Sequence, residues 1–186
     1  MYGIIQKSIE EMVVKSFGHE KWETILDEAG VAERDFVLLK SYPDEVTLAI
    51  VGAATRVLGL SVDTVLETFG EHWIIYAERG YGGLLRMSGG TFPEVVANLD
   101  AMHTRIKLNM PELRPPSFRC EPQGDGLMRL HYFSERTGLE PVVRGMLRSL
   151  ARRMGVEIDF KQSRAADDGH AIFDVRYSAP GSWDAR

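Results

Sequence analysis

The segment "ELRPPSF", residues 112–118, divides the sequence into a helical part and a part that contains strands. Two consecutive prolines, Pro115 and Pro116, exclude a helix here, because proline lacks a backbone N–H and forces the preceding residue into an extended conformation. Before this segment, apolar residues recur every three or four positions, which is the period of an amphipathic helix. After it, short β-rich runs surround one further helical run. We therefore predict an α+β fold.

We predict one domain over residues 1–186, with a mainly helical subdomain at 1–110 and an α+β subdomain at 111–180. The second subdomain is expected to hold a roughly four-stranded antiparallel sheet and a helix. The expected helices lie at 4–18, 20–30, 44–59, 61–79, 92–109 and 139–155, and the expected strands at 117–121, 126–134, 156–162 and 170–177. A polar loop at 163–169 separates the last two strands, and the tail from residue 178 is expected to be frayed or to lead into a linker.

Composition excludes several classes of protein. The chain has 22 Lys+Arg against 27 Asp+Glu and no large basic block, so we expect no binding to nucleic acid. No apolar run approaches the ~20 residues of a bilayer-spanning helix, and the N-terminal stretch does not resemble a signal peptide. The single cysteine, Cys120, has no partner for an internal disulfide, which is typical of a reducing compartment. We therefore expect a cytoplasmic protein that does not bind membranes.

One histidine, His103, lies within the apolar stripe of the expected helix 92–109. The stripe consists of Phe92, Val95, Val96, Leu99, Met102, Ile106 and Met110. A histidine at such a position is either a core residue hydrogen-bonded to a neighbour or an imidazole ligand held in an apolar wall. The spacing alone leaves both interpretations open.

If His103 binds a metal, haem suits the sequence better than zinc. A structural zinc site needs about four Cys or His ligands, and the other histidines show no ligand spacing with Cys120 or with each other. Haem needs only one axial histidine, because the porphyrin supplies the other four nitrogens.

The stretch "LHYFSERTGL", residues 130–139, offers partners for haem propionates. Tyr132, Ser134 and Arg136 occupy alternate positions, so on a strand their side chains would point to one face. Two hydroxyl groups and a planar guanidinium are suitable donors for carboxylates. The alternative is a polar, outward strand face with an ordinary surface arginine, and this triplet alone does not distinguish the two.

Taken together, these motifs resemble the haem nitric oxide/oxygen binding (H-NOX) domain, the sensor domain of soluble guanylate cyclase and of free-standing bacterial sensors. The shared segments, in order, are "MYGII", "YGGLL", "NLDAMH", "LRPPSFRC" and "LHYFSERTGL". The resemblance covers essentially the whole chain. It implies a helical subdomain packed on an α+β subdomain, with haem b (protoporphyrin IX iron) between them.

The resemblance also implies roles for single residues. His103 matches the axial ligand of the haem iron, and Tyr132, Ser134 and Arg136 match the triplet that binds the propionates. Pro116 matches the proline that presses on the porphyrin and distorts it, although its sequence context alone also fits a linker proline. Cys120 matches a cysteine of the guanylate cyclase branch, and a buried inert thiol is its default interpretation.

The resemblance places the gas on a distal wall. By family position this wall consists of Ile5, Phe69, Trp73, Val142 and Met146. Family members that hold oxygen use a distal tyrosine, and the segment 137–147 contains none. We therefore expect a sensor that binds nitric oxide and carbon monoxide at ferrous iron, excludes oxygen, and signals by loss of the iron–histidine bond.

Two other classes of protein stay open at this point. One is a haem protein with redox or peroxidase-like activity, which needs a distal acid–base group, and the presumed wall has none apart from His72 beside Trp73. The other is a haem-free scaffold of the same fold. The sequence shows no cyclase or kinase site, so we expect no catalysis by this chain. The resemblance implies a partner such as a histidine kinase, a cyclic-di-GMP enzyme or a cyclase.

Overall fold

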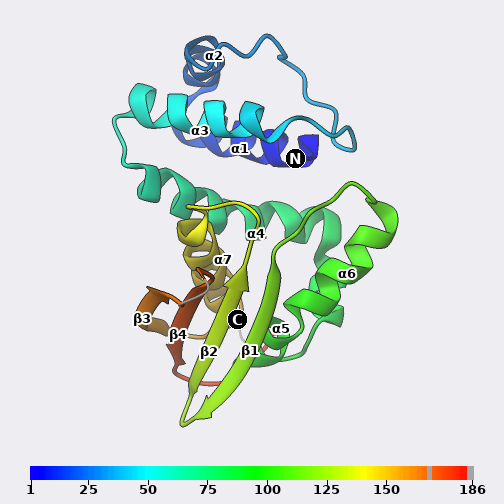
Figure 1. The fold of residues 1–186 in the computed structure, drawn as a ribbon, viewed down its shortest axis with the longest axis vertical. Coiled ribbons are helices and arrows are strands. Elements are labelled where there is room, and N and C mark those ends of the chain that lie inside the picture. The colour runs from blue at the N-terminus through cyan, green and yellow to red at the C-terminus, as the bar shows by residue number, and fades with distance from the viewer. Residues whose placement is uncertain (167–168, 184–186) are drawn as a thin grey trace. The chain divides into compact units, whose positions relative to one another are not determined.

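A computed structural model describes residues 1–166 and 169–183, and only the backbone of residues 162–165. The helices are α1 (Gly3–Phe17), α2 (His19–Glu28), α3 (Asp44–Leu58), α4 (Val62–Met87), α5 (Phe92–Ala97), α6 (Leu99–Asn109) and α7 (Glu140–Arg153). The strands are β1 (Ser117–Gly124), β2 (Leu127–Phe133), β3 (Ile158–Ala165) and β4 (Ala171–Tyr177). Figure 1 shows these elements in chain order. The α+β prediction is confirmed.

The chain forms two compact units that differ from the predicted subdomains. Unit 1 comprises Met1–Tyr76 with Pro141–Met146, and unit 2 comprises Ala77–Glu140 with Leu147–Arg186. The Pro-containing segment 111–116 therefore lies inside unit 2. The boundary between the two units instead passes through α4 and α7, which each contribute residues to both units.

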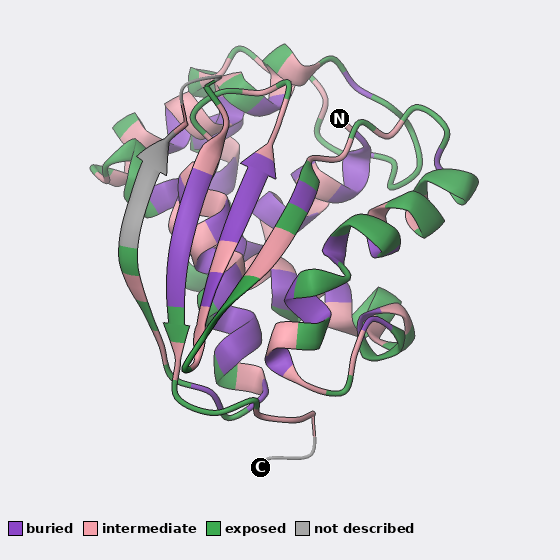
Figure 2. Ribbon diagram, turned by 60° about the horizontal axis from the view of Figure 1, so that its bottom comes forward, coloured by how far each residue is buried: buried purple, intermediate pink, exposed green. Residues whose placement is uncertain are grey.

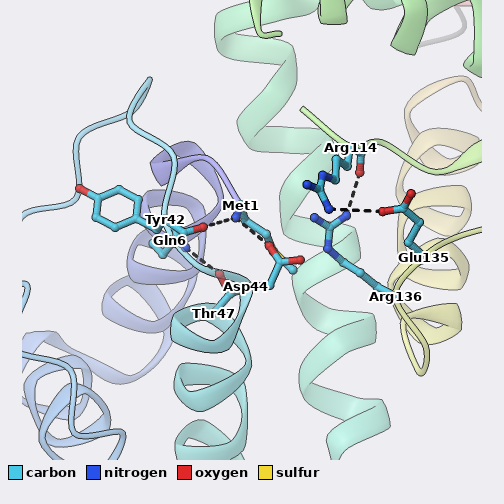
Figure 3. A network of polar contacts seen from close by, with 8 residues as sticks. All are labelled: Met1, Gln6, Tyr42, Asp44, Thr47, Arg114, Glu135 and Arg136. Atoms are coloured by element: carbon cyan, nitrogen blue, oxygen red, sulfur yellow. Dashed lines mark hydrogen bonds and ion pairs between the residues drawn. The ribbon is translucent and has the colours of Figure 1, made fainter. Parts of the chain in front are cut away.

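Unit 1 is organised around a helical core. Its fully buried side chains include Trp22, Ile25, Leu26, Phe36 and Ile50. The start of α1 is held by the amino group of Met1, which donates to the Asp44 carboxylate at 2.8 Å and to the carbonyl oxygen of Tyr42. Gln6 Nε2 donates to Thr47 Oγ1 at 2.6 Å (Figure 3). These bonds hold the first turn of α1, which carries Ile5, against the segment that leads into α3.

Two glycines allow α4 and α7 to approach closely within unit 1. A Cβ atom on Gly70 would lie 2.2 Å from the carbonyl oxygen of Val142, and one on Gly145 would lie 2.0 Å from that of Glu67. No side chain fits at either position, so the two backbones are in direct contact. This crossing places Val142 and Met146 of α7 beside the segment of α4 that bears Phe69.

Unit 2 contains an antiparallel sheet with the strand order β1-β2-β4-β3. In its register Phe118 faces Tyr132, and Leu130 faces Phe173. Because side chains alternate between faces, Phe118 and Tyr132 share the core face with Leu130 and Phe173. Figure 2 shows that buried residues concentrate on the central strands β2 and β4. The expected four-stranded antiparallel sheet is confirmed.

The predicted helix 92–109 is interrupted at Asn98. This residue leaves the helical conformation (φ −98°, ψ 8°), and its Nδ2 donates to the carbonyl oxygen of Ser88 at 2.8 Å. Asparagine competes with helix hydrogen bonds in this way, so α5 ends at Ala97 and α6 begins at Leu99. A capping box is present at the start of α5, because Glu94 Oε2 accepts from the backbone N–H of Thr91 at 3.0 Å.

The ends of other elements also differ from expectation. The glycine-containing segment 80–87 continues α4, with non-helical dihedral angles at Tyr81, so α4 ends at Met87 and not at residue 79. β3 runs to Ala165 into the predicted polar loop, of which residues 167–168 lie outside the described part. The tail at 178–183 is not frayed, because the N–H of Ser182 donates to the carbonyl oxygen of Met154 at 3.1 Å. Residues 184–186 lie outside the described part.

Candidate functional site

His103 is held in one orientation by Pro116. Its Nδ1 atom lies 3.0 Å from the carbonyl oxygen of Pro116. A carbonyl oxygen only accepts hydrogen bonds, so Nδ1 carries the proton and Nε2 keeps its lone pair. This is the tautomer that a metal-ligating histidine uses, with the far nitrogen hydrogen-bonded to a carbonyl group. The segment between α6 and β1 therefore fixes the orientation of the His103 ring and leaves the lone pair of Nε2 free of this hydrogen bond.

Burial favours the neutral form of this imidazole. Desolvation lowers the pKa of His103, and the hydrogen bond to Pro116 and the charge of Asp100 oppose this effect only in part. A neutral ring at neutral pH is what an axial ligand needs, because a protonated Nε2 has no lone pair to donate.

Contacts between aromatic rings connect His103 to the sheet. The ring of Phe118 lies 5.8 Å from that of His103 and 5.5 Å from that of Tyr132, measured between centroids. Asp100, three residues before His103 on α6, accepts the backbone N–H of Phe118 at 3.1 Å. α6 and the start of β1 are thereby fastened together, and Tyr132 lies on the same side of the sheet as the histidine.

The structure brings Tyr132, Ser134 and Arg136 to one pocket of about 210 Å³. The strand argument for this was wrong, because β2 ends at Phe133 and only Tyr132 of the three belongs to it. A turn takes the place of strand alternation: Ser134 Oγ accepts the backbone N–H of Arg136 at 3.0 Å.

The guanidinium of Arg136 is positioned by the chain segment that precedes β1. One of its terminal nitrogens donates to the carbonyl oxygen of Arg114 at 2.7 Å (Figure 3). Arg114 itself makes an exposed ion pair with Glu135 at 3.7 Å. With the hydroxyl groups of Tyr132, Ser134 and Thr137 and one guanidinium against the single carboxylate of Glu140, the polar groups of this pocket suit an anionic ligand. Burial raises the pKa of Tyr132, so its phenol stays a donor at neutral pH.

The sequence did not point to His170, which also lines this pocket. His170 Nε2 lies 2.8 Å from Nδ1 of His131, and its ring stacks on Phe133 with a centroid distance of 4.3 Å. His131 Nε2 lies 3.6 Å from the Glu121 carboxylate. These residues are far apart in the sequence and share no motif, so only the strand register reveals them. Within residues 1–166 and 169–183, no group of three or more His, Cys, Asp or Glu is arranged to hold a metal ion.

The five predicted distal residues all belong to unit 1, and all are partly exposed. Ile5 and Phe69 pack against the rim of the helical core. The rings of Phe69 and Trp73 lie 6.2 Å apart, and Trp73 stacks on Tyr76 with centroids 6.1 Å apart. Tyr76 is a phenol beside this apolar group that the sequence did not single out. His72 points toward α1, where its Nε2 lies 3.4 Å from the Glu11 carboxylate.

Comparison with known proteins identifies the family. Residues 2–162 match the profile of the Haem-NO-binding (HNOB) family. The chain belongs to this family. Among curated proteins it is 34% identical over 161 residues to soluble guanylate cyclase gcy-35 of Caenorhabditis elegans, covering 83% of this chain. It is 37% identical over 165 residues to gcy-37 of the same organism, covering 87% of this chain. The chain spans only 23% of the length of each of these two relatives.

Solved structures confirm the fold. An H-NOX protein from S. oneidensis in the Fe(II) state superimposes with a TM-score of 0.89 at 20% identity, covering 97% of both chains. The Fe(II)NO state of an H-NOX protein from the same organism gives a TM-score of 0.87 and covers 96% of this chain and all of that one. The recognition of an H-NOX domain is thus confirmed. No single helix among the described residues is long and apolar enough to cross a membrane, and one sharply bent pair, α3 with α4, passes by length and composition alone.

Proposed function

We propose that this domain is a haem-based sensor of nitric oxide. The observation that carries the proposal is the hydrogen bond from His103 Nδ1 to the carbonyl oxygen of Pro116, which leaves Nε2 free to bind iron. Membership of the Haem-NO-binding family supports it. The pocket of Tyr132, Ser134 and Arg136 adds the donors that propionates require.

The cofactor would be haem b, held without covalent bonds to the protein. Attachment through thioether bonds uses a Cys-x-x-Cys-His motif, and this chain has one cysteine. His103 would be the axial ligand, and Tyr132, Ser134 and Arg136 would hold the propionates. Pro116 has two roles in this proposal: its carbonyl oxygen orients His103, and its ring presses on the porphyrin. When bound, ferrous haem supplies the iron that takes up the gas.

The domain would bind nitric oxide and carbon monoxide and exclude oxygen. The residues assigned to the distal wall by family position are apolar, apart from the indole N–H of Trp73. Bound oxygen carries partial negative charge and needs a hydrogen-bond donor, whereas nitric oxide binds ferrous iron strongly without one. Tyr76, stacked on Trp73, is a phenol next to these residues, and removing it tests the apolar character of the wall.

The signal would be the release of His103 from the iron. A freed imidazole no longer constrains α6, and the hydrogen bonds of Asp100 and Pro116 pass the change to the start of β1. A ligand that favours one arrangement of these elements shifts the population toward it. The partner that reads the change would be a cyclase, a histidine kinase or a cyclic-di-GMP enzyme. We propose that the domain has no catalytic activity of its own.

The deciding experiment is the visible spectrum of the reduced protein, first without gas, then with nitric oxide, and then in air. A Soret band that shifts with nitric oxide, and no stable oxygen complex in air, is the expected result. A persistent oxygen complex would keep the haem and overturn the selectivity, and Tyr76→Phe would then test the phenol as the donor. No Soret band after haem is supplied would refute the sensor and leave a scaffold of the same fold. Turnover of hydrogen peroxide would favour the redox alternative.

A further inference from the structure

The C-terminal segment 178–183 is fastened to the turn between α4 and α5, within unit 2. Trp183 Nε1 donates to the carbonyl oxygen of Gly89 at 2.8 Å, and the Arg86 guanidinium lies over its indole ring, 5.5 Å from the centroid. The carbonyl oxygen of Pro180 accepts the backbone N–H of Phe92, the first residue of α5, at 2.8 Å. The tail thus contacts the end of α4, the turn and the start of α5.

The same turn is fastened from the other side by the junction of α5 and α6. Asn98 Nδ2 donates to the carbonyl oxygen of Ser88 at 2.8 Å. The consecutive carbonyl groups of Ser88 and Gly89 are therefore bound by two different parts of the chain, Asn98 and Trp183. The turn is also packed closely against α5, because a Cβ atom on Gly89 would lie 2.6 Å from Cβ of Glu94.

The junction is directly connected to His103. Asn98 immediately precedes α6, and His103 follows five residues later, roughly 7.5 Å along the helix axis at 1.5 Å per residue. A helix of this length moves as a stiff body, so a displacement of α6 at His103 reaches Asn98. From Asn98 it reaches the turn, and from the turn it reaches Trp183.

We propose that segment 178–183 is a strap that holds α5 and α6 in the arrangement with His103 on the iron, and that it loosens when His103 is released. This inference rests on the proposed function and adds the route by which the signal leaves the domain. Coupling between two sites is reciprocal, so weakening the strap must also change the release of His103. That reciprocity makes the proposal testable in the isolated domain without knowledge of the partner.

The first test compares three variants of the haem-loaded protein. Trp183→Ala removes both the indole N–H and the aromatic ring, Trp183→Phe removes the N–H but keeps a smaller aromatic ring, and Pro180→Ala keeps the backbone carbonyl as a matched control. The rate at which His103 leaves the iron after mixing with nitric oxide is read from the Soret band. We expect an increase of about fivefold for Trp183→Ala, as one lost neutral hydrogen bond gives, a smaller increase for Trp183→Phe and none for Pro180→Ala. Equal rates in all four proteins would refute the strap.

The second test uses amide hydrogen exchange of the unmodified protein and does not depend on any variant. The N–H of Phe92 donates to Pro180, and the N–H of Ser182 donates to Met154. Both should exchange faster when nitric oxide is bound, whereas the N–H of Val156, which donates to Ala151 at 2.9 Å, should not change. Unchanged exchange beside a normal Soret shift would overturn the strap and leave the sensor intact. A chain that takes up no haem would overturn both.

Discussion

The Nδ1 atom of His103 and the carbonyl oxygen of Pro116 lie 3.0 Å apart, which joins the candidate iron ligand to the residue assigned to porphyrin distortion. The two roles are therefore not independent. A change at residue 116 that moves the backbone also turns the imidazole, whereas Pro116→Ala keeps the carbonyl group and isolates the effect of the ring. The same segment supplies the carbonyl oxygen of Arg114 that positions Arg136, so one short stretch of chain orients both His103 and Arg136.

Removing the guanidinium of Arg136 should weaken haem retention. A charge-assisted hydrogen bond contributes roughly 1.5–3 kcal/mol, so Arg136→Ala should release haem at least about tenfold faster. The haem release rate of Arg136→Lys should lie between those of the parent protein and Arg136→Ala, because lysine keeps the positive charge and loses the planar guanidinium. The measurement is the transfer of haem to an excess of a haem-scavenging apoprotein.

Arg119→Ala is the matched control for this experiment. Arg119 is an exposed arginine on β1 of the same unit, where it forms an ion pair with Glu121 at 3.3 Å. Its loss should leave the release rate unchanged. Equal rates for Arg136→Ala and the parent protein would exclude Arg136 from the propionate site.

An alanine at Gly70 should destabilise the protein, because its Cβ atom would lie 2.2 Å from the carbonyl oxygen of Val142. Forcing the two helices apart should cost about 1–3 kcal/mol. Gly80→Ala is the control: the position lies in α4 with nothing within 4 Å, so alanine should be neutral or stabilise by up to about 1 kcal/mol. Urea unfolding monitored by circular dichroism measures both. Similar midpoints for the two variants would contradict the close crossing of α4 and α7.

The thiol of Cys120 should be unreactive in the folded protein. Burial, with a smaller contribution from the charge of Glu121, raises its pKa from 9.0 to about 11. At pH 8 the folded protein should then hold roughly a hundredfold less thiolate than the unfolded chain, and iodoacetamide should modify it correspondingly slowly. Because the folded pKa is the higher one, its contribution to stability is complete below pH 9 and is lost as the pH rises toward 11. Fast labelling at pH 8 without denaturant would show that the thiol is exposed.

The capping carboxylate of Glu94 should make stability depend on acidic pH. Hydrogen bonds from Thr91 and from the backbone N–H of Gly90 lower its pKa below 4.5. The folded state therefore binds this proton less readily than the unfolded state, so the contribution is present above about pH 4.5 and is lost as the pH falls below it. Glu94→Gln keeps an acceptor without the titration, and its urea midpoint should fall less between pH 5 and pH 3.5 than that of the parent. A parallel decline in both proteins would contradict this assignment.

Local features were predictable because they depend on residues that are close in sequence. The helix periods, the capping box of Thr91 and Glu94, and the position of Pro141 in the first turn of α7 all follow from interactions within a few residues. The strand runs were predictable for the same reason, whereas the strand order β1-β2-β4-β3 depends on pairing between segments far apart in the sequence. That Tyr132, Ser134 and Arg136 line one pocket was also predictable from the triplet and its resemblance to the family, but the geometry of the pocket was not. Strand alternation suggested a common face, whereas a turn after Phe133 brings Ser134 and Arg136 to Tyr132.

Sequence by itself therefore determined the α+β class, the family and the identity of the residues proposed to hold haem. Tertiary structure alone decided the tautomer of His103, the pair of His131 with His170 and the docking of Trp183 on Gly89. The partners in the last two contacts are 39 and 94 residues apart, and no local pattern marks either residue as the other's partner. Such contacts form only when strand register and helix ends are already in place, because a hydrogen bond needs its two atoms within about 3 Å, and only the folded chain sets that distance.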